Sequence, residues 1–239
     1  SVYDSPMWLA HYCNRNEDRT RLIMNASIKY DITSWLNIQG RYGYDMYRDF
    51  IEDIYYDGTR VGPQTAGGNY SIKSPFFARD VFDVLLSGDN KFGDFTLTYN
   101  LGASRRHDHD ESSSYSTGGL TRPNIFEIEN AVSKGGSYSH GDEELQSVYA
   151  TAQIGWRDAL YFDATARNDW SSTLPAPYSY FYPSFGLTAI LSELLPMPEW
   201  IDFAKLRNAY SDVGSSADRY MLAEIYTPNA KYGYVTPDS

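Results

Sequence analysis

Apolar and polar residues alternate along several long stretches of the chain, and the most informative stretch runs from Leu160 to Leu191. Between Leu160 and Ala166 every second side chain is apolar, and the side chains between them are tyrosine, hydroxyl-bearing or charged. After a polar break that contains prolines, the alternation resumes at Phe185. A repeat of two residues indicates a β-strand, because successive side chains of a strand point to opposite faces. The stretch therefore predicts strands with one apolar face and one polar face.

The same alternation predicts further strands before and after this stretch. They cover residues 22–32, 36–47, 79–87, 95–104, 145–156 and 203–213. The connections between them differ in length. Short corners are expected at 33–34, 88–94 and 157–159, and long polar loops at 48–75, 105–143 and 214–239. A meander with short turns at one end and long loops at the other is typical of an outer-membrane barrel.

These elements predict an all-β fold, namely an antiparallel up-and-down transmembrane β-barrel of which about eight strands are present. Eight strands alone would close a narrow barrel whose interior is filled by side chains. Here the inward parity carries charged residues and glycines, and the expected loops are long for so small a pore. We therefore expect residues 1–239 to be a fragment of the barrel domain of a larger protein with about 22 strands.

Composition and charge narrow the class of protein further. The chain has 239 residues, of which 16% are aromatic, but no run of about 18 apolar residues that would predict a transmembrane helix. Barrel strands need an apolar residue only at every second position, so the absence of a long apolar run does not argue against them. The net charge of -11, with no basic stripe, excludes a nucleic-acid partner. The single cysteine, Cys13, excludes an internal disulfide.

No arrangement of residues predicts catalysis, a cofactor or a metal site, and the protein is not expected to be an enzyme. Asp163 and Asp169 supply two carboxylates, as a glycosidase needs. Six residues along one strand separate them by about 20 Å, however, and glycosidase chemistry requires roughly 5 to 10 Å. His107 and His109, in the sequence HDHDE, have no second cluster to complete a metal site and are expected in a solvated loop.

Acidic residues also gather between Asp45 and Asp57, within and after the second predicted strand. They lack the regular spacing of a calcium-binding loop. Whether a loop of this chain binds calcium is left open by the sequence.

Several segments resemble the SusC/RagA family of TonB-dependent outer-membrane transporters. The resemblance lies in residues 161–175 (YFDATARNDWSSTLP), 180–195 (YFYPSFGLTAILSELL), 19–45, 147–175 and 200–218. They occur in the order and spacing of that family and together touch well over half of the chain. Asn208 departs from the pattern, because the family commonly has a small apolar residue there on the lipid-facing parity.

The resemblance implies TonB-dependent import of a glycan or an oligopeptide across the Gram-negative outer membrane. The implied partners are a SusD-like surface lipoprotein, TonB, the cargo and the outer-membrane lipid. The plug domain and the TonB box of such transporters are not among these residues. In that setting the residues expected to line the lumen are Arg41, Asp45, Asp163, Arg167, Asp169, Lys205 and Arg207. The loop aromatics expected to stack on a cargo are Tyr55, Tyr56, Tyr70 and Tyr115.

A second hypothesis comes from a different class of protein. A soluble, secreted all-β carbohydrate-binding module would use the same tyrosines but would bury the apolar stripes between two sheets. The two hypotheses therefore differ in whether apolar side chains such as Leu22, Met24 and Ile28 face lipid or are buried between two sheets.

Overall fold

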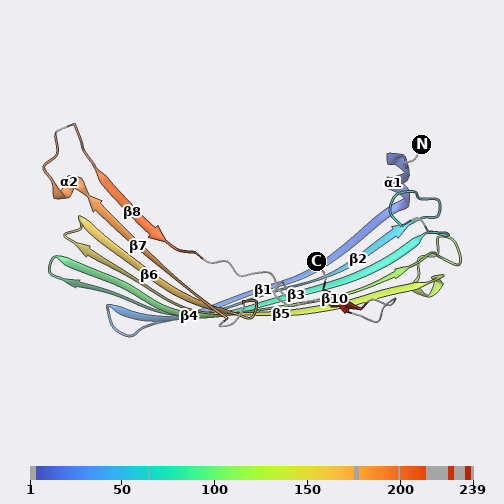
Figure 1. The fold of residues 1–239 in the computed structure, drawn as a ribbon, viewed down its shortest axis with the longest axis horizontal. Coiled ribbons are helices and arrows are strands. Elements are labelled where there is room, and N and C mark those ends of the chain that lie inside the picture. The colour runs from blue at the N-terminus through green and yellow to red at the C-terminus, as the bar shows by residue number, and fades with distance from the viewer. Residues whose placement is uncertain are drawn as a thin grey trace. The chain divides into compact units, whose positions relative to one another are not determined.

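A computed structural model of the chain describes residues 4–63, 65–174, 178–198, 200–213, 226–228 and 235–237. Its main element is one eight-stranded sheet in the order β1-β2-β3-β4-β5-β6-β7-β8, so each strand pairs with the next one in the sequence (Figure 1). The strands are antiparallel, and β1 and β8 are the two edges of the sheet. This arrangement confirms the predicted all-β, up-and-down architecture.

The strands of this sheet are β1 (Cys13–Asp31), β2 (Leu36–Tyr55), β3 (Asn69–Phe92), β4 (Phe95–Thr117), β5 (Lys134–Trp156), β6 (Leu160–Ser171), β7 (Ser179–Ile190) and β8 (Lys205–Ser211). Short helices are α1 (Pro6–Tyr12), η1 (Ile128–Asn130) and α2 (Leu191–Leu194). Two three-residue strands, β9 (Tyr226–Pro228) and β10 (Val235–Pro237), pair only with each other.

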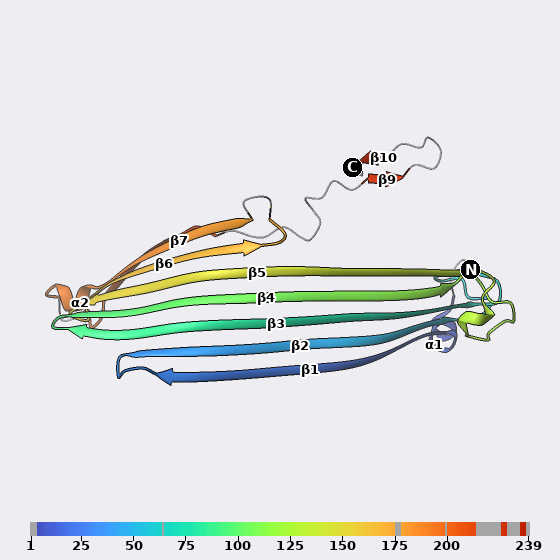
Figure 2. The same cartoon turned by 90° about the horizontal axis from the view of Figure 1, so that it is seen from below.

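The chain divides into two compact units, and each strand from β1 to β5 contributes to both of them. Unit 1 comprises Ser1–Asn25, Gly43–Asp80 and His107–Asp142. Unit 2 comprises Ala26–Tyr42, Val81–Arg106 and Glu143–Ser239, and so it also contains β6, β7 and β8. Figure 2 shows β1 to β7 lying side by side in sequence order.

The long loops predicted at 48–75 and 105–143 are wrong in extent. Strand β2 continues to Tyr55 and β3 begins at Asn69, which leaves a connection of residues 56–68. Strand β4 likewise continues to Thr117, and β5 begins at Lys134. The extension of β4 carries polar side chains on both faces, so no hydrophobic alternation marks it in the sequence. The extension of β2 places Phe50 and Ile51 on opposite faces among charged residues, which also breaks the alternation. The first strand is also longer than predicted, because β1 begins at Cys13 and follows helix α1, which was not predicted.

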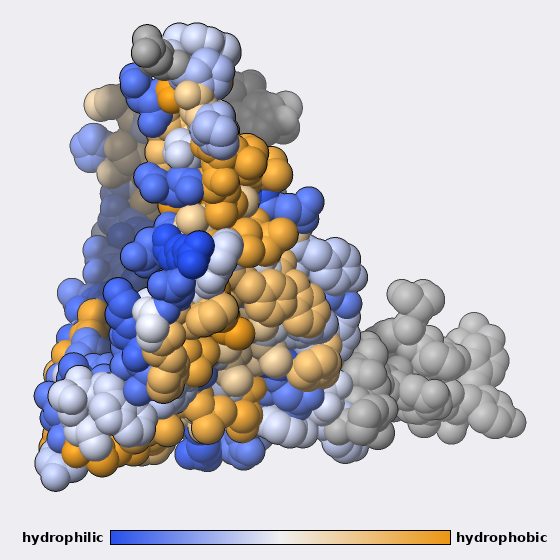
Figure 3. All heavy atoms as spheres, turned by 90° about the vertical axis from the view of Figure 1, so that its left-hand side faces the viewer, coloured by the Kyte–Doolittle hydropathy of each residue, from blue (hydrophilic) through white to orange (hydrophobic). Residues whose placement is uncertain are grey.

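One face of the sheet is apolar and uncovered, and we refer to it as the apolar face. Many of its large side chains are exposed: Leu22, Met24, Ile28, Ile38, Tyr42, Phe82, Phe95, Leu101, Val148, Ile154, Phe162, Phe185, Leu187 and Leu206. Figure 3 shows hydrophobic side chains gathered into patches on the surface that it presents. Among the residues that the structure describes, the buried hydrophobic side chains are only Ile51, Leu120 and Ala159.

The register of the last strands fixes which residues share the apolar face. Ile154 of β5 pairs with Phe162 of β6, which in turn pairs with Leu187 of β7. Leu187 pairs with Asn208 of β8, so this asparagine does lie on the apolar face, as the sequence parity indicates. No helix in the described part of the chain has both the length and the apolar character needed to cross a membrane.

Candidate functional site

The opposite face of the sheet, which we call the polar face, carries arginines that pair with carboxylates on the following strand. In unit 1, Arg19 of β1 donates from Nε and Nη2 to the two oxygens of Asp49 on β2, at 2.6 Å each. Arg79 of β3 binds Asp108 of β4 in the same way, at 2.7 Å for both bonds. Two parallel bonds of this kind are the strongest geometry that an arginine and a carboxylate form.

Burial makes these pairs necessary. The side chains of Asp49 and Asp108 are each only 4% exposed, although their arginines remain about half exposed. A buried carboxylate without a cation would be strongly destabilising. The same arrangement continues with smaller burial at Arg21–Asp45 and Arg15–Asp53 in unit 1 and at Arg106–Glu143 in unit 2.

Asp83 of β3 joins three strands of unit 2 on the polar face. Arg41 of β2 donates to one of its oxygens from Nε at 2.8 Å and from Nη2 at 2.5 Å. The hydroxyl of Tyr149, on β5, donates to the other oxygen at 2.8 Å. To reach it, the tyrosine ring passes over Gly102 of β4, where a Cβ atom would overlap the ring. Because Gly102 has no side chain, Tyr149 of β5 can reach across β4 and bond to Asp83 of β3.

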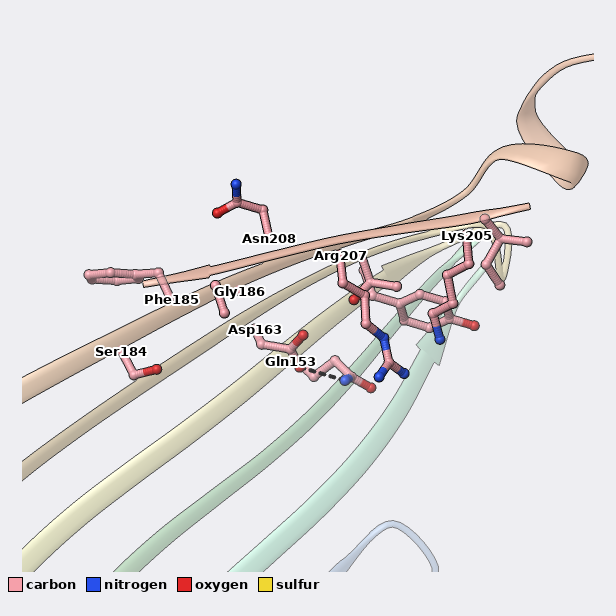
Figure 4. A pocket seen from close by; sticks show the side chains of 12 residues that line it. Gln153, Asp163, Ser184, Phe185, Gly186, Lys205, Arg207 and Asn208 are labelled. Atoms are coloured by element: carbon pink, nitrogen blue, oxygen red, sulfur yellow. Dashed lines mark hydrogen bonds between the residues drawn. The ribbon is translucent and has the colours of Figure 1, made fainter. Parts of the chain in front are cut away.

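A hollow of about 560 Å³ opens on the polar face of unit 2 beside β8 (Figure 4). Its walls include Lys205 and Arg207 of β8 and the pair Gln153 and Asp163, in which the amide donates to the carboxylate at 2.6 Å. Figure 4 shows the side chains of Lys205 and Arg207 extending to the same side of the sheet as Gln153. The hollow thus combines two cations with one carboxylate, which accepts a hydrogen bond from an amide.

All seven residues predicted to line a lumen lie on the polar face. The list is Arg41, Asp45, Asp163, Arg167, Asp169, Lys205 and Arg207. Arg167 donates to Asp169 Oδ1 at 2.7 Å and to Ser147 at 3.0 Å, and the hydroxyl of Tyr182 also bonds to Asp169. Asp163 and Asp169 thus have different partners, and neither faces the other across a cleft. That this face lines a lumen stays a prediction.

The four tyrosines predicted as loop aromatics differ in their surroundings. The ring of Tyr56 packs edge-on against Tyr12 and Phe126, with centroids 5.3 and 4.8 Å away. The hydroxyl of Tyr70, in β3, donates to Glu52 at 2.6 Å. These two tyrosines therefore make contacts that hold unit 1 together.

The other two tyrosines lie in or at the end of strands. Tyr55 ends β2, and its ring lies against Gly62. Tyr115, in β4, is 51% exposed, so of the four it offers the most accessible ring.

The two connections of unit 1, residues 56–68 and 118–133, interlock. Asp57 accepts a hydrogen bond from the amide of Gly67 at 2.9 Å, and its own amide donates to Asn124 Oδ1 at 2.8 Å. The amide of Leu120 donates to the carbonyl of Ala66 at 3.0 Å. Gly67 has a φ of 79° and lies so close to the Leu120 carbonyl that no Cβ fits between them. The two connections therefore form one ordered body.

One ion pair in this region lies at the end of the second connection. Lys134 Nζ lies 2.7 Å from Glu129 Oε2, and this ammonium group lowers the pKa of the Glu129 carboxyl below its ordinary value. Both side chains are exposed, so the interaction is open to solvent and salt.

The expectation that His107 and His109 lie in a loop is wrong, because both belong to β4. His109 Nδ1 lies 2.8 Å from Asp142 of β5, and His107 lies 3.4 Å from both Asp142 and Asp80. The histidines thus contact carboxylates of β3 and β5 on the parity of the apolar face. Within the described ranges, no group of three or more His, Cys, Asp or Glu residues is placed to hold a metal ion.

Sequence reasoning missed the members of the arginine–carboxylate pairs outside the predicted strands. They are Arg15, Arg19, Asp49, Asp53, Arg106, Asp108 and Glu143, and the Tyr149–Asp83 bond was also missed. A signal was present, because Asp45, Asp49 and Asp53 recur with even spacing, which places them on one face of a strand. Three carboxylates of the acidic cluster between Asp45 and Asp57 therefore pair with arginines of β1, whereas Glu52 accepts a bond from Tyr70 and Asp57 one from the amide of Gly67.

Comparisons with known proteins support the fold. No family model matches the chain, and no curated protein matches it. The RagAB peptide transporter matches it in structure with a TM-score of 0.82 at 14% sequence identity, over 97% of this chain and 27% of that one. The RagAB peptide importer in its "open-open" state matches with a TM-score of 0.80 at 14% identity, over 97% of this chain and 26% of that one.

These likenesses are likenesses of fold. The chain spans about a quarter of the length of the chains that it matches. Its antiparallel up-and-down sheet is part of a transmembrane β-barrel fold and is not closed within the described residues. The total of about 22 strands stays a prediction.

Proposed function

We propose that the chain is part of the barrel of a TonB-dependent transporter of the SusC/RagA type, located in the Gram-negative outer membrane. It would import a glycan or an oligopeptide together with a SusD-like surface lipoprotein, with energy delivered through TonB and a plug domain outside these residues. The likeness to the RagAB peptide transporter supports a complex of this kind and favours the oligopeptide as cargo.

The observation that carries the proposal is the combination of an uncovered apolar face with a charged opposite face in one layer of sheet. Ile28 is 75% exposed and Leu101 is 52% exposed, both at positions where a soluble sandwich would bury them. In a barrel the same side chains face the lipid, while the polar face borders a wet interior. The carbohydrate-binding module would need a second layer over the apolar face, and the described ranges contain no such layer.

The polar face resembles the lining of a channel more than a catalytic site, because most of its charged side chains are paired with one another. Its charged groups on β1 to β6 are largely neutralised by one another, as in Arg19–Asp49 and Arg41–Asp83. We propose that this face lines the lumen. Tyr115 is exposed but has the parity of the apolar face in β4, so its ring would contact cargo only from outside the lumen. Import, and not a reaction, is then the function of the chain.

The proposal is tested by placing one charge on each face of β1 in the whole protein. Ile28→Arg puts a guanidinium on the apolar face, and Ser27→Arg puts the same group on the adjacent position of the polar face. In a bilayer the first substitution should cost about 2–4 kcal/mol near the membrane centre, whereas the second should cost little. The measurement is the amount of protein in the outer-membrane fraction that migrates differently on a gel before and after boiling.

The expected result is strong loss of the heat-modifiable form for Ile28→Arg and near wild-type assembly for Ser27→Arg. In a soluble protein, by contrast, arginine at a position already 75% exposed is a surface substitution of small effect. Equal assembly of both variants, or recovery of the protein in a soluble fraction without a shift on boiling, would end the transporter proposal.

A further inference from the structure

Arg207 stands out among the arginines of the polar face, and Lys205 lies beside it. Every arginine of this face on β1 to β6 has a carboxylate partner in the structure: Arg15, Arg19, Arg21, Arg41, Arg79, Arg106 and Arg167. Arg207 and Lys205 have no ion-pair partner in the part of the chain that the structure describes. Both are exposed and lie two residues apart on one strand, so they point to the same side.

The strands next to them supply no carboxylate. Across the β7–β8 ladder, Lys205 faces Ile190 and Arg207 faces Thr188. One strand farther, Thr188 faces Tyr161, whose hydroxyl donates to the Asp158 carbonyl. These neighbours leave both positive charges without compensation.

The carboxylate that shares the hollow is already engaged. Asp163 accepts the amide of Gln153 at 2.6 Å and makes no ion pair with either cation. It lies opposite Gly186, and a Cβ atom there would meet the Asp163 side chain at 3.5 Å. The absence of a side chain at Gly186 keeps the floor of the hollow open in front of the two cations (Figure 4).

We propose that Lys205 and Arg207 form a carboxylate-binding site at this hollow. The guanidinium can take a carboxylate by two parallel bonds, and the ammonium adds a third donor from the same side. Ser184 and Thr188 line the same hollow and offer hydroxyls to the rest of the bound group. The chemistry fits a carboxylate of the cargo, in which case the inference rests on the proposed transport function, or a carboxylate from another part of the same polypeptide.

The experiment uses the whole protein in detergent and three variants. K205Q/R207Q removes both charges and keeps polar side chains, whereas K205R/R207K keeps both charges. K73Q is the control, because Lys73 is a lysine on the polar parity of β3, in unit 1, and has no ion pair in the structure. Two quantities are measured for each protein: the melting temperature, and the retention of peptides from a tryptic digest of serum albumin whose carboxylates are either free or methyl-esterified.

If the cargo supplies the carboxylate, K205Q/R207Q should retain free-carboxylate peptides about tenfold more weakly than wild type. Esterified peptides should be unaffected, and the melting temperature should not change. If the polypeptide supplies it, peptide retention should be unchanged and the melting temperature should fall by roughly 2–4 °C. In either case K205R/R207K should restore most of the loss and K73Q should behave like wild type.

The proposal is overturned if K205Q/R207Q differs from wild type no more than K73Q does in both measurements. Equal loss of free and esterified peptides, or a loss that K205R/R207K does not restore, would also overturn it, because neither depends on a bound carboxylate. Wild-type protein that retains neither form of peptide would contradict oligopeptide import. The melting temperature would then still decide whether the site exists.

Discussion

The two units are built from the same strands but by different chemistry. In unit 2 the strands have an apolar face, with Phe82, Leu101 and Val148 exposed on it. In unit 1 the positions of the same parity include several charged residues and histidines: Arg48, Glu52, Asp80, His107, His109 and Asp142. They alternate there with apolar side chains such as Leu22, Met24 and Phe50. The difference indicates that the apolar face is more continuous in unit 2, whereas β4 and β5 in unit 1 are polar on both faces.

The largest expected effect in unit 1 comes from removing an arginine beside a buried carboxylate. Arg19→Ala should destabilise the whole protein by about 3 kcal/mol, because Asp49 is 4% exposed and would lose both of its charged hydrogen bonds. Arg21→Ala, two residues along the same face, should lower the unfolding midpoint much less, since the Asp45 side chain is 34% exposed and solvent screens the pair. Urea unfolding in detergent measures both values. An equal loss of stability in the two variants would show that burial of the carboxylate does not determine the strength of these arginine–carboxylate pairs.

A smaller effect is expected in unit 2 from closing the opening at Gly102. Gly102→Ala should cost about 2 kcal/mol, because the new methyl group displaces the Tyr149 ring and breaks its bond to Asp83. The double-mutant cycle with Tyr149→Ala tests this cause, since Gly102→Ala should then be nearly neutral. A full cost in the Tyr149→Ala background would mean that the glycine is needed for the backbone of β4 and not for the tyrosine.

The smallest expected effect concerns the exposed pair Glu129–Lys134 in unit 1. Lys134 lowers the pKa of Glu129 in the folded protein, so the ionised carboxyl stabilises the fold above the unfolded-state pKa of about 4.3. This contribution is lost as the pH falls from about 4.3 through the lower, folded-state pKa. Glu129→Gln should therefore melt slightly below wild type at pH 7 and equally with it at the acidic end. Salt at about 1 M should abolish the difference at pH 7, and persistence in salt would contradict an ionic cause.

The fold of unit 2 was more predictable than that of unit 1, for a physical reason. Hydrophobic alternation identifies a strand only when one of its faces avoids water, as in the stretch from Leu160 to Ala166. The parts of β4 and β5 in unit 1 carry mostly polar side chains on both faces, so their sequence predicts loops. Their pairing depends on contacts such as Arg79–Asp108, which join residues 29 apart and require the strand register to be known.

The candidate site, too, could be predicted only in part from the sequence. Parity alone placed Arg41, Arg167 and Arg207 on one face, and the strand pairing agrees with that placement. Parity does not reveal which cations are paired, because a partner lies on another strand at a register that the sequence does not state. The contrast between a neutralised Arg41 and an uncompensated Arg207 emerged only from the structure.

The length of the paired strands has a consequence for proteolysis. A strand needs about 9–11 residues to cross a bilayer, whereas β3 has 24 and β4 has 23. In the proposed setting the surplus is backbone locked in a hydrogen-bonded ladder, which a protease cannot draw into its cleft. The tips that remain, residues 56–68 and 118–133, are tied together through Asp57, Asn124 and Gly67. Intact cells treated with protease should therefore keep this part of the barrel whole, and a single cut in one tip should leave its ends held by the other.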